Sequence, residues 1–246
     1  MRLATTLPSL LGEVFPKSRP GTRSTLARAA TVRTFRPGEE ILLQGDETSV
    51  GLLLEGQVAL RRTTPDGRQL VVRIVDRGKL PAVLPLAARP ASADAVALTP
   101  TPVAMWRGVD VRSLATADPG LAVDLMDHAL DALADVTGRL EELIYQDAPR
   151  RVARVLHQHA DLFFAEGPVL TRRELPMLVG TSREMTGRVI RVLEARGIVV
   201  RVGRYGFKLL DPVALAATAQ ARDERRRITD GPGEANPRGR ARSGLP

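Results

Sequence analysis

The sequence predicts an α+β protein with an N-terminal antiparallel strand-rich domain, a long helix and a C-terminal winged helix-turn-helix. Short apolar runs broken by glycine and proline fill the first half, a helical period follows, and two short helical patterns flank a glycine near residue 180. We expect an uninterpreted N-terminal extension, the strand-rich domain, the helix, the helix-turn-helix domain and a disordered basic tail. Their bounds are 1–19, 20–117, 118–146, 147–215 and 216–246.

The first half of the chain has the pattern of an antiparallel sheet. Apolar residues 52–54 precede Gly56, and Val58 and Leu60 follow at alternate positions. The sequence Pro65-Asp66-Gly67 predicts a turn into the apolar run at 70–75. Short strands of this kind predict a sandwich or barrel.

Residues 118–146 switch to helical period. Seven positions recur at spacings of three and four residues, the seam of a coiled coil: Val123, Met126, Leu130, Leu133, Thr137, Leu140 and Ile144. The alternative is a stripe that packs only on the chain's own core. For a long helix between two domains we favour a parallel seam with a second copy, which predicts a homodimer.

The C-terminal domain is expected to begin at Asp147-Ala148-Pro149, because proline suits a first helical turn and interrupts a continuous helix. Thr171 followed by Glu174 is a capping-box pattern that starts a short helix. Gly180 then permits a sharp turn, and Thr181 or Ser182 can cap the next helix.

The second helix of this motif has two expected faces. The inward face carries Met185, Val189, Val192 and Leu193, and the outward face carries Arg183, Glu184, Gly187, Arg188 and Arg191. A helix that presents arginine and glutamate near its N-terminus is suited to contact base edges in a DNA major groove. After it, apolar runs on either side of Gly203-Arg204 predict a β-hairpin wing at 198–202 and 205–209.

Each of these residues also has an ordinary structural interpretation. Glu184, three positions after Thr181, fits a reciprocal capping role, and arginines on an exposed helix are commonly solvated charges. Their grouping on one face of a helix-turn-helix favours base contact. Arg172 and Arg173, at the start of the first helix, suit phosphate contacts that set register.

The sequence also resembles the CRP/FNR family of bacterial transcription regulators. The run 181–189 is similar to the family's recognition helix, and residues 35–39, 45–46 and 53–58 are similar to its β-roll, the cyclic-nucleotide-binding-like sensor domain. The resemblance covers roughly residues 20–212. It implies base reading by Arg183, Glu184 and Arg188, and phosphate contacts by Thr171 and Arg172. The full set of expected DNA-binding residues is Arg183, Glu184, Arg188, Thr171, Arg172, Arg173 and Ser182.

The ligand cassette is where the chain departs from this family. In cyclic-nucleotide binders of the family, a Gly-Glu pair holds the ribose and a later arginine neutralises the cyclic phosphate. Here Ala82 and Val83 align with Gly-Glu, and Ala91 or Ala93 aligns with the arginine. Asp94 is expected to repel a phosphate, and Arg89 is the nearby cation that a loop shift would have to recruit. We therefore expect no cyclic AMP binding of the usual kind.

Composition favours a polyanionic partner and excludes several kinds of site. The net charge is +8, with a pI of about 10.9, and the absence of cysteine excludes disulfides, thiolate zinc sites and cysteine-ligated clusters. His128 is a conceivable haem ligand, but a surface histidine is the more common case, and His157 and His159 face different directions on a helix. We expect no cofactor, no metal, no enzymatic site, no membrane segment and a cytoplasmic protein.

Two functions remain open from the sequence. The first is a dimeric transcription regulator whose partners are double-stranded DNA, a second copy and RNA polymerase. The second is an architectural or scaffold DNA-binding protein whose β-roll serves only protein contacts. A regulator should protect a few palindromic sites, whereas an architectural protein should coat DNA with little preference.

Overall fold

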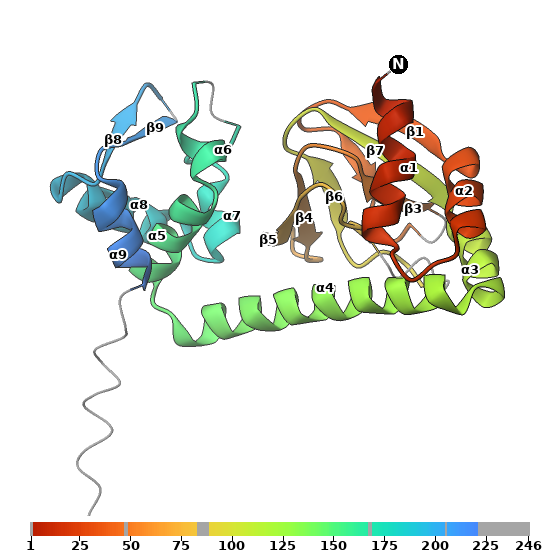
Figure 1. Ribbon diagram of the computed structural model, residues 1–246. Helices are drawn as coiled ribbons and strands as arrows, with labels where there is room; N and C mark the ends of the chain where they lie inside the picture. Colours follow the sequence, from red (N-terminus) through yellow and green to blue (C-terminus); the bar gives the residue numbers. More distant parts are fainter. Residues whose placement is uncertain (1, 47–48, 83–88, 167–168, 205, 221–246) are drawn as a thin grey trace, which may run out of the picture.

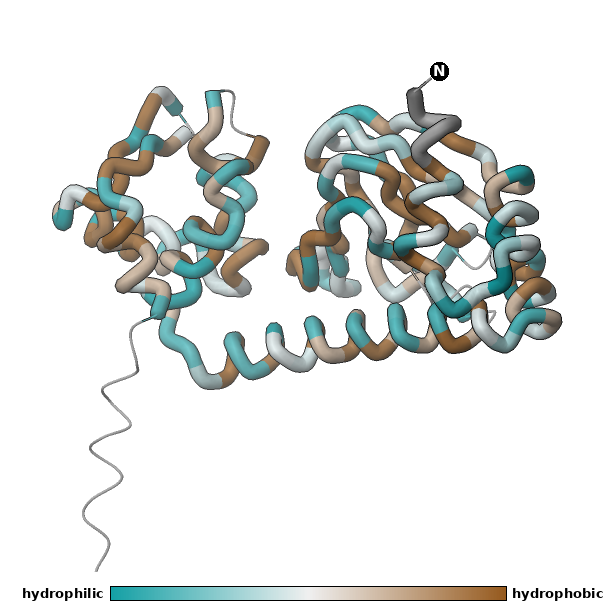
Figure 2. Tube along the Cα trace, in the orientation of Figure 1, coloured by the Kyte–Doolittle hydropathy of each residue, from teal (hydrophilic) through white to brown (hydrophobic). Residues whose placement is uncertain are grey.

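The computed structural model describes residues 2–46, 49–82, 89–166, 169–204 and 206–220 (Figure 1). Two domains lie side by side, and one long helix runs along both of them. Apolar residues gather inside each domain (Figure 2). Within the described residues, no helix combines the length and the apolar character needed to cross a bilayer.

The N-terminal residues form two helices that cover the strand domain. Helix α1 spans Arg2–Val14 and helix α2 spans Pro20–Ala29. Leu7, Leu10 and Leu11 are buried, at the spacing of one helical face, in a core shared with the strands. The uninterpreted extension is thus part of the domain, and the expectation of strands from residue 20 is wrong for α2. Pro20 occupies the first helical turn, where its missing N–H is not needed.

The strand domain is an antiparallel two-sheet sandwich, as predicted. One sheet has the order β1-β7-β3 and the other β2-β6-β4-β5. The strand bounds are β1 Thr31–Phe35, β2 Glu40–Leu42, β3 Ser49–Leu53, β4 Val58–Thr63, β5 Gln69–Val75, β6 Asp94–Ala97 and β7 Thr101–Arg107. Phe35, Leu53 and Val58 pack between the sheets. Gly67 has a φ of 79° in the β4–β5 turn, which confirms the predicted hairpin.

The long helix has the predicted position. Helix α3, Gly108–Ala117, leads into α4, Pro119–Tyr145, and the Asp118 side chain caps α4 by accepting from the Gly120 N–H at 3.0 Å. At 27 residues, α4 is about 40 Å long. The helix ends before Pro149, as expected, where Asp147 caps the next helix by accepting from the Arg150 N–H at 2.9 Å.

Hydrogen bonds to a carboxylate and ion pairs hold one face of α4 against the strand domain. Asp124 is buried and accepts backbone N–H groups of Lys17 and Ser18 at 3.0–3.2 Å. Further along, Lys79 pairs with Asp131 at 3.3 Å and Arg73 with Asp135 at 2.8 Å. The Arg73 side chain is only 11% exposed, so its pair is screened less than a surface pair. These contacts join α4 to the α1–α2 connection, to β5 and to the segment after β5.

The C-terminal domain is a winged helix-turn-helix, as predicted. Its elements are α5 Ala148–Gln158, α6 Ala160–Phe164, α7 Leu175–Val179, α8 Arg183–Ala195, β8 Val199–Val202, β9 Gly206–Leu209 and α9 Pro212–Gln220. Leu156, Phe163 and Leu193 lie in its core. The predicted disordered tail needs correction, because residues 216–220 belong to α9, where Ala219 is buried against α5. Residues 221–246 lie outside the described residues.

Candidate nucleic-acid interface and ligand position

A capping arrangement opens the helix-turn-helix. The Glu174 carboxylate accepts from the Thr171 N–H at 2.9 Å and from its hydroxyl at 2.5 Å, while the Thr171 hydroxyl oxygen accepts from the Arg173 N–H at 3.2 Å. The predicted contact between Thr171 and Glu174 is present, but the predicted helix start needs correction: α7 begins only at Leu175, and its N-cap residue Glu174 makes no side-chain cap hydrogen bond. The turn holds Arg172 and Arg173 at the entry of the motif.

The turn and the second cap also follow the sequence. Gly180 has a φ of 70°, a left-handed conformation that favours glycine, and its N–H donates to the Pro176 carbonyl at 2.9 Å. Ser182, rather than Thr181, caps α8: its hydroxyl accepts from the Met185 N–H at 3.1 Å. Helix α8 therefore begins directly after a hydrogen-bonded turn.

The inward face of α8 differs from the prediction. Val189 and Leu193 are buried as expected, but Met185 is 37% and Val192 55% exposed, so the inward prediction for those two is wrong. Thr186 and Ile190 are buried in their place and complete the inward face. Thr186 can occupy the core because its hydroxyl donates to the Ser182 carbonyl at 2.9 Å.

The outward face of α8 carries the predicted charged residues. Arg183, Glu184, Arg188 and Arg191 are all exposed. Glu184 pairs with Arg188 one turn later at 2.5 Å, so its carboxylate serves this ion pair while Ser182 provides the cap. An exposed pair of this kind is worth only about 0.3–0.5 kcal/mol. Both side chains can therefore exchange the pair for base edges at little cost.

A cavity of about 430 Å³ lies beside this face and gathers arginines from three parts of the domain. Arg172 and Arg173 come from the entry turn, Arg183 from the start of α8 and Arg204 from the wing. Guanidinium groups bind phosphate oxygens in bidentate fashion, so the cavity suits a DNA phosphate. The sequence argument missed Arg204; its position at the Gly203 turn of the predicted hairpin was the signal for it.

The wing itself is held to α8. Strands β8 and β9 pair antiparallel, as predicted, and Arg201 Nε donates to Glu194 Oε1 at 2.6 Å. The hydrogen bond from Arg201 lowers the pKa of Glu194 and raises that of Arg201. This pair fixes the wing relative to the recognition helix. Tyr205 lies outside the described residues.

Both candidate arginine positions of the ligand cassette, Ala91 and Ala93, are described in the structure and carry no charge. Ala91 is buried, and its N–H donates to the Asp46 carbonyl at 2.7 Å, so that donor is already used within the chain. Ala93 is half-buried and Arg89 is exposed. Val83, aligned with the family's glutamate, lies outside the described residues.

Asp94 has a different environment from the one expected. Its carboxylate accepts from the Gln44 N–H at 2.8 Å and pairs with Arg61 at 3.4 Å. The expected repulsion of a phosphate by Asp94 therefore needs correction, since Arg61 compensates its charge. The alanine at the arginine position is the stronger argument against a cyclic phosphate.

His128 makes contacts within the fold that join two helices. His128 Nε2 lies 3.1 Å from the Val14 carbonyl oxygen, and its ring packs edge-on against Phe15, with centroids 5.7 Å apart. His128 thereby joins α4 to the end of α1. His157 is exposed and His159 is half-buried.

His159 gives a pH-dependent prediction. Burial lowers its pKa below the ordinary value of 6.5, although Asp161 and Asp76 oppose the shift. The folded protein therefore binds this proton only at a lower pH than the unfolded chain, so stability is complete above about pH 6.5 and declines below it. We expect the urea midpoint of the wild-type protein to decrease when the pH is lowered from about 7.5 to about 5.5. The decrease should be smaller in His159→Gln. Equal falls in both proteins would assign the effect to other groups.

Comparison with known proteins agrees with this arrangement. Residues 32–118 match the cyclic nucleotide-binding domain family, and residues 150–218 match the Crp-like helix-turn-helix domain family. The chain is 31% identical over 175 residues to the cyclic AMP receptor protein of Thermus thermophilus, covering 70% of this chain and 80% of that protein. It is 27% identical over 179 residues to the cAMP-activated global transcriptional regulator Vfr of Pseudomonas aeruginosa, covering 68% and 84%.

A solved structure extends the likeness to three dimensions. The CRP/FNR-family transcriptional regulator TTHA1359 of Thermus thermophilus matches with a TM-score of 0.65 and 27% identity, over 78% of this chain and 100% of that one. In this chain, the two matched domains are separated by the long helix α4. The chain belongs to the CRP/FNR family of DNA-binding transcription regulators.

Proposed function

We propose that this chain is a homodimeric, sequence-specific regulator that reads a palindromic operator through residues 182–195, without cyclic AMP control of the family's usual kind. The observation that carries the proposal is the exposed outer face of α8, where Arg183, Glu184 and Arg188 follow a capped turn. Its partners are double-stranded DNA, a second copy of the chain and, at a promoter, RNA polymerase.

The exposed seam of α4 supports the homodimer. Five apolar side chains at heptad positions are more than half exposed: Met126, Leu130, Leu133, Leu140 and Ile144. A row of this length is a candidate for burial against a partner. A parallel pairing along α4 places two copies of α8 for two half-sites, and two-fold symmetry then requires a palindrome.

Selection from a random DNA pool tests this function. The wild-type protein should enrich an inverted repeat whose half-site centres are about one helical turn apart. Enrichment of no sequence, together with continuous coating of DNA, would favour the architectural alternative.

Cyclic AMP is expected neither to bind tightly nor to stimulate operator binding. Relatives named as a cAMP-activated regulator and as a cyclic AMP receptor protein are similar to this chain, yet its described cassette presents alanine at both candidate arginine positions. Loss of a charge-assisted bidentate contact removes much of the phosphate affinity. Calorimetry with cyclic AMP and cyclic GMP, with operator binding in parallel, measures this. Micromolar affinity with stimulated operator binding would contradict it and assign the phosphate to Arg89.

A further inference from the structure

The last two turns of α4 have two different surroundings. Leu140 and Ile144, on the proposed seam, are more than half exposed. Arg139 and Glu142 lie on another side, with only 13% and 20% of their side chains exposed. The same short stretch of helix therefore lies between the proposed dimer partner and the chain's own helix-turn-helix.

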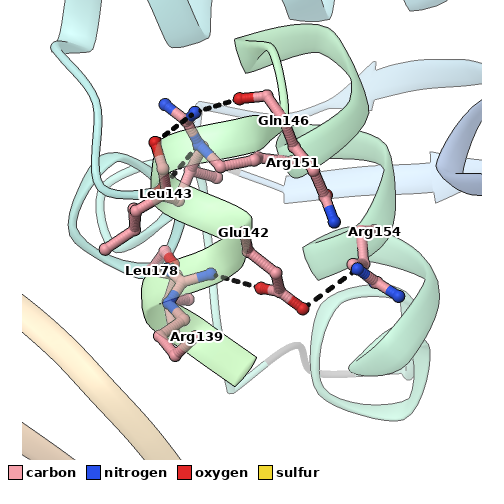
Figure 3. A network of polar contacts seen from close by, with 8 residues as sticks. Arg139, Glu142, Leu143, Gln146, Arg151, Arg154 and Leu178 are labelled. Atoms are coloured by element: carbon pink, nitrogen blue, oxygen red, sulfur yellow. Dashed lines mark hydrogen bonds and ion pairs between the residues drawn. The ribbon is translucent and has the colours of Figure 1, made fainter. Parts of the chain in front are cut away.

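Two arginines hold the end of the first helix of the motif (Figure 3). Arg139 Nη2 donates to the Leu178 carbonyl oxygen, and Arg151 Nε donates to the Val179 carbonyl oxygen at 3.2 Å. These two carbonyls end α7, where backbone acceptors have no partner within the helix. The guanidinium groups thus satisfy the helix end immediately before Gly180.

Both arginines are also bonded to the end of α4. Glu142 accepts from Arg139 at 3.0 Å through one carboxylate oxygen and pairs with Arg154 of α5 at 3.1 Å through the other (Figure 3). Arg151 donates to the Gln146 carbonyl oxygen at 2.5 Å. Guanidinium groups stay charged and present their donors in a fixed plane, so this network defines one relative orientation of α4, α5 and α7.

The turn that follows is packed tightly against the same helix. A Cβ at Gly180 would lie 2.6 Å from the Leu143 side chain, so the turn packs directly against a side chain of α4. Helix α8 begins at Arg183, three residues further on. Because the connection between α7 and α8 is very short and capped, the orientation of α7 determines that of α8.

We propose that Arg139 and Arg151 are positioning residues that set the angle between α4 and α8, and thereby the half-site spacing that the dimer reads, without a ligand. This inference rests on the proposed function. In a dimer joined along α4, the separation of the two α8 helices follows from this angle, and the operator half-sites must match it, about 34–36 Å apart.

The test compares three kinds of DNA: the operator selected by the wild-type protein, one half-site of it, and operators with one or two base pairs added or removed between the half-sites. Arg139→Ala should bind the operator about tenfold more weakly, change half-site binding by less than about twofold, and lose the preference for the selected spacing. Arg139→Lys retains a donor and should recover part of that preference. Arg77→Ala, which removes an arginine paired with Glu13 on the strand domain, is the matched control and should behave as wild type.

An unchanged spacing preference in Arg139→Ala would overturn the proposal, because the angle would then be set elsewhere. Equal losses on operator and half-site would also overturn it, since they indicate general damage to the helix-turn-helix. If Arg139→Ala does not fold, the same DNA series on Arg151→Lys decides: a lysine cannot reproduce the paired guanidinium contacts to the Val179 and Gln146 carbonyls, so the spacing preference should weaken while half-site binding is kept. Failure of the proposed function looks different: the wild-type protein itself would select no palindrome.

Discussion

Replacing Leu133 with glutamate should convert the protein to monomers and weaken operator binding about 100-fold or more, because two linked half-site contacts become one. Leu133 is 62% exposed at the middle of the seam, where a partner helix would have to bury the new charge. Sedimentation velocity gives the oligomeric state, and titration of operator and half-site DNA gives the affinity.

Ala134→Glu is the matched control for the seam. Ala134 is exposed at the rim beside Leu133, a position where coiled coils commonly carry glutamate. It should remain dimeric. An unchanged dimer in Leu133→Glu would move the interface away from α4 and remove the argument from heptad spacing.

Arg183→Ala and Arg188→Ala should each cost about 1–3 kcal/mol of operator binding and relax the preference at one base pair per half-site. Arg172→Ala should weaken all DNA alike and reduce the salt dependence, because a phosphate contact carries no sequence information. Binding to the selected operator and to random DNA at several salt concentrations separates the two effects.

Arg196→Ala provides the control for charge alone, since Arg196 is exposed at the opposite end of α8. If Arg183→Ala and Arg188→Ala reduce specific and random binding equally, the outer face of α8 is not the reading surface. Arg188 is the sharper case, because Arg183 also lines the arginine cavity that suits a DNA phosphate.

Local sequence patterns correctly predicted the turns, caps and helix ends, because neighbouring residues determine these features. Gly180 turns because its φ is positive, Ser182 caps because its hydroxyl meets a free N–H, and Pro149 ends the long helix. The same rules failed where distant packing decides. Met185 and Val192 have helical spacing, but the domain core lies against Thr186 and Ile190 instead.

The environment of the ligand position was also beyond local rules. Asp94 is compensated by Arg61, 33 residues away in the chain, and Arg73 is neutralised by Asp135 across the gap to α4. Such pairs depend on sheet register and helix docking, which no window of sequence contains. The contacts of Arg139 and Arg151 with backbone carbonyl oxygens could not be predicted either, because every residue carries such an acceptor whatever its side chain.

The most direct measurement is the ratio of dissociation constants for scrambled DNA and for the selected operator, at one salt concentration, with and without cyclic AMP. The account predicts a ratio of at least about 10³ in the absence of the nucleotide, and no change on its addition. A ratio near one would contradict sequence-specific reading by α8. A high ratio that arises only with cyclic AMP would contradict ligand independence.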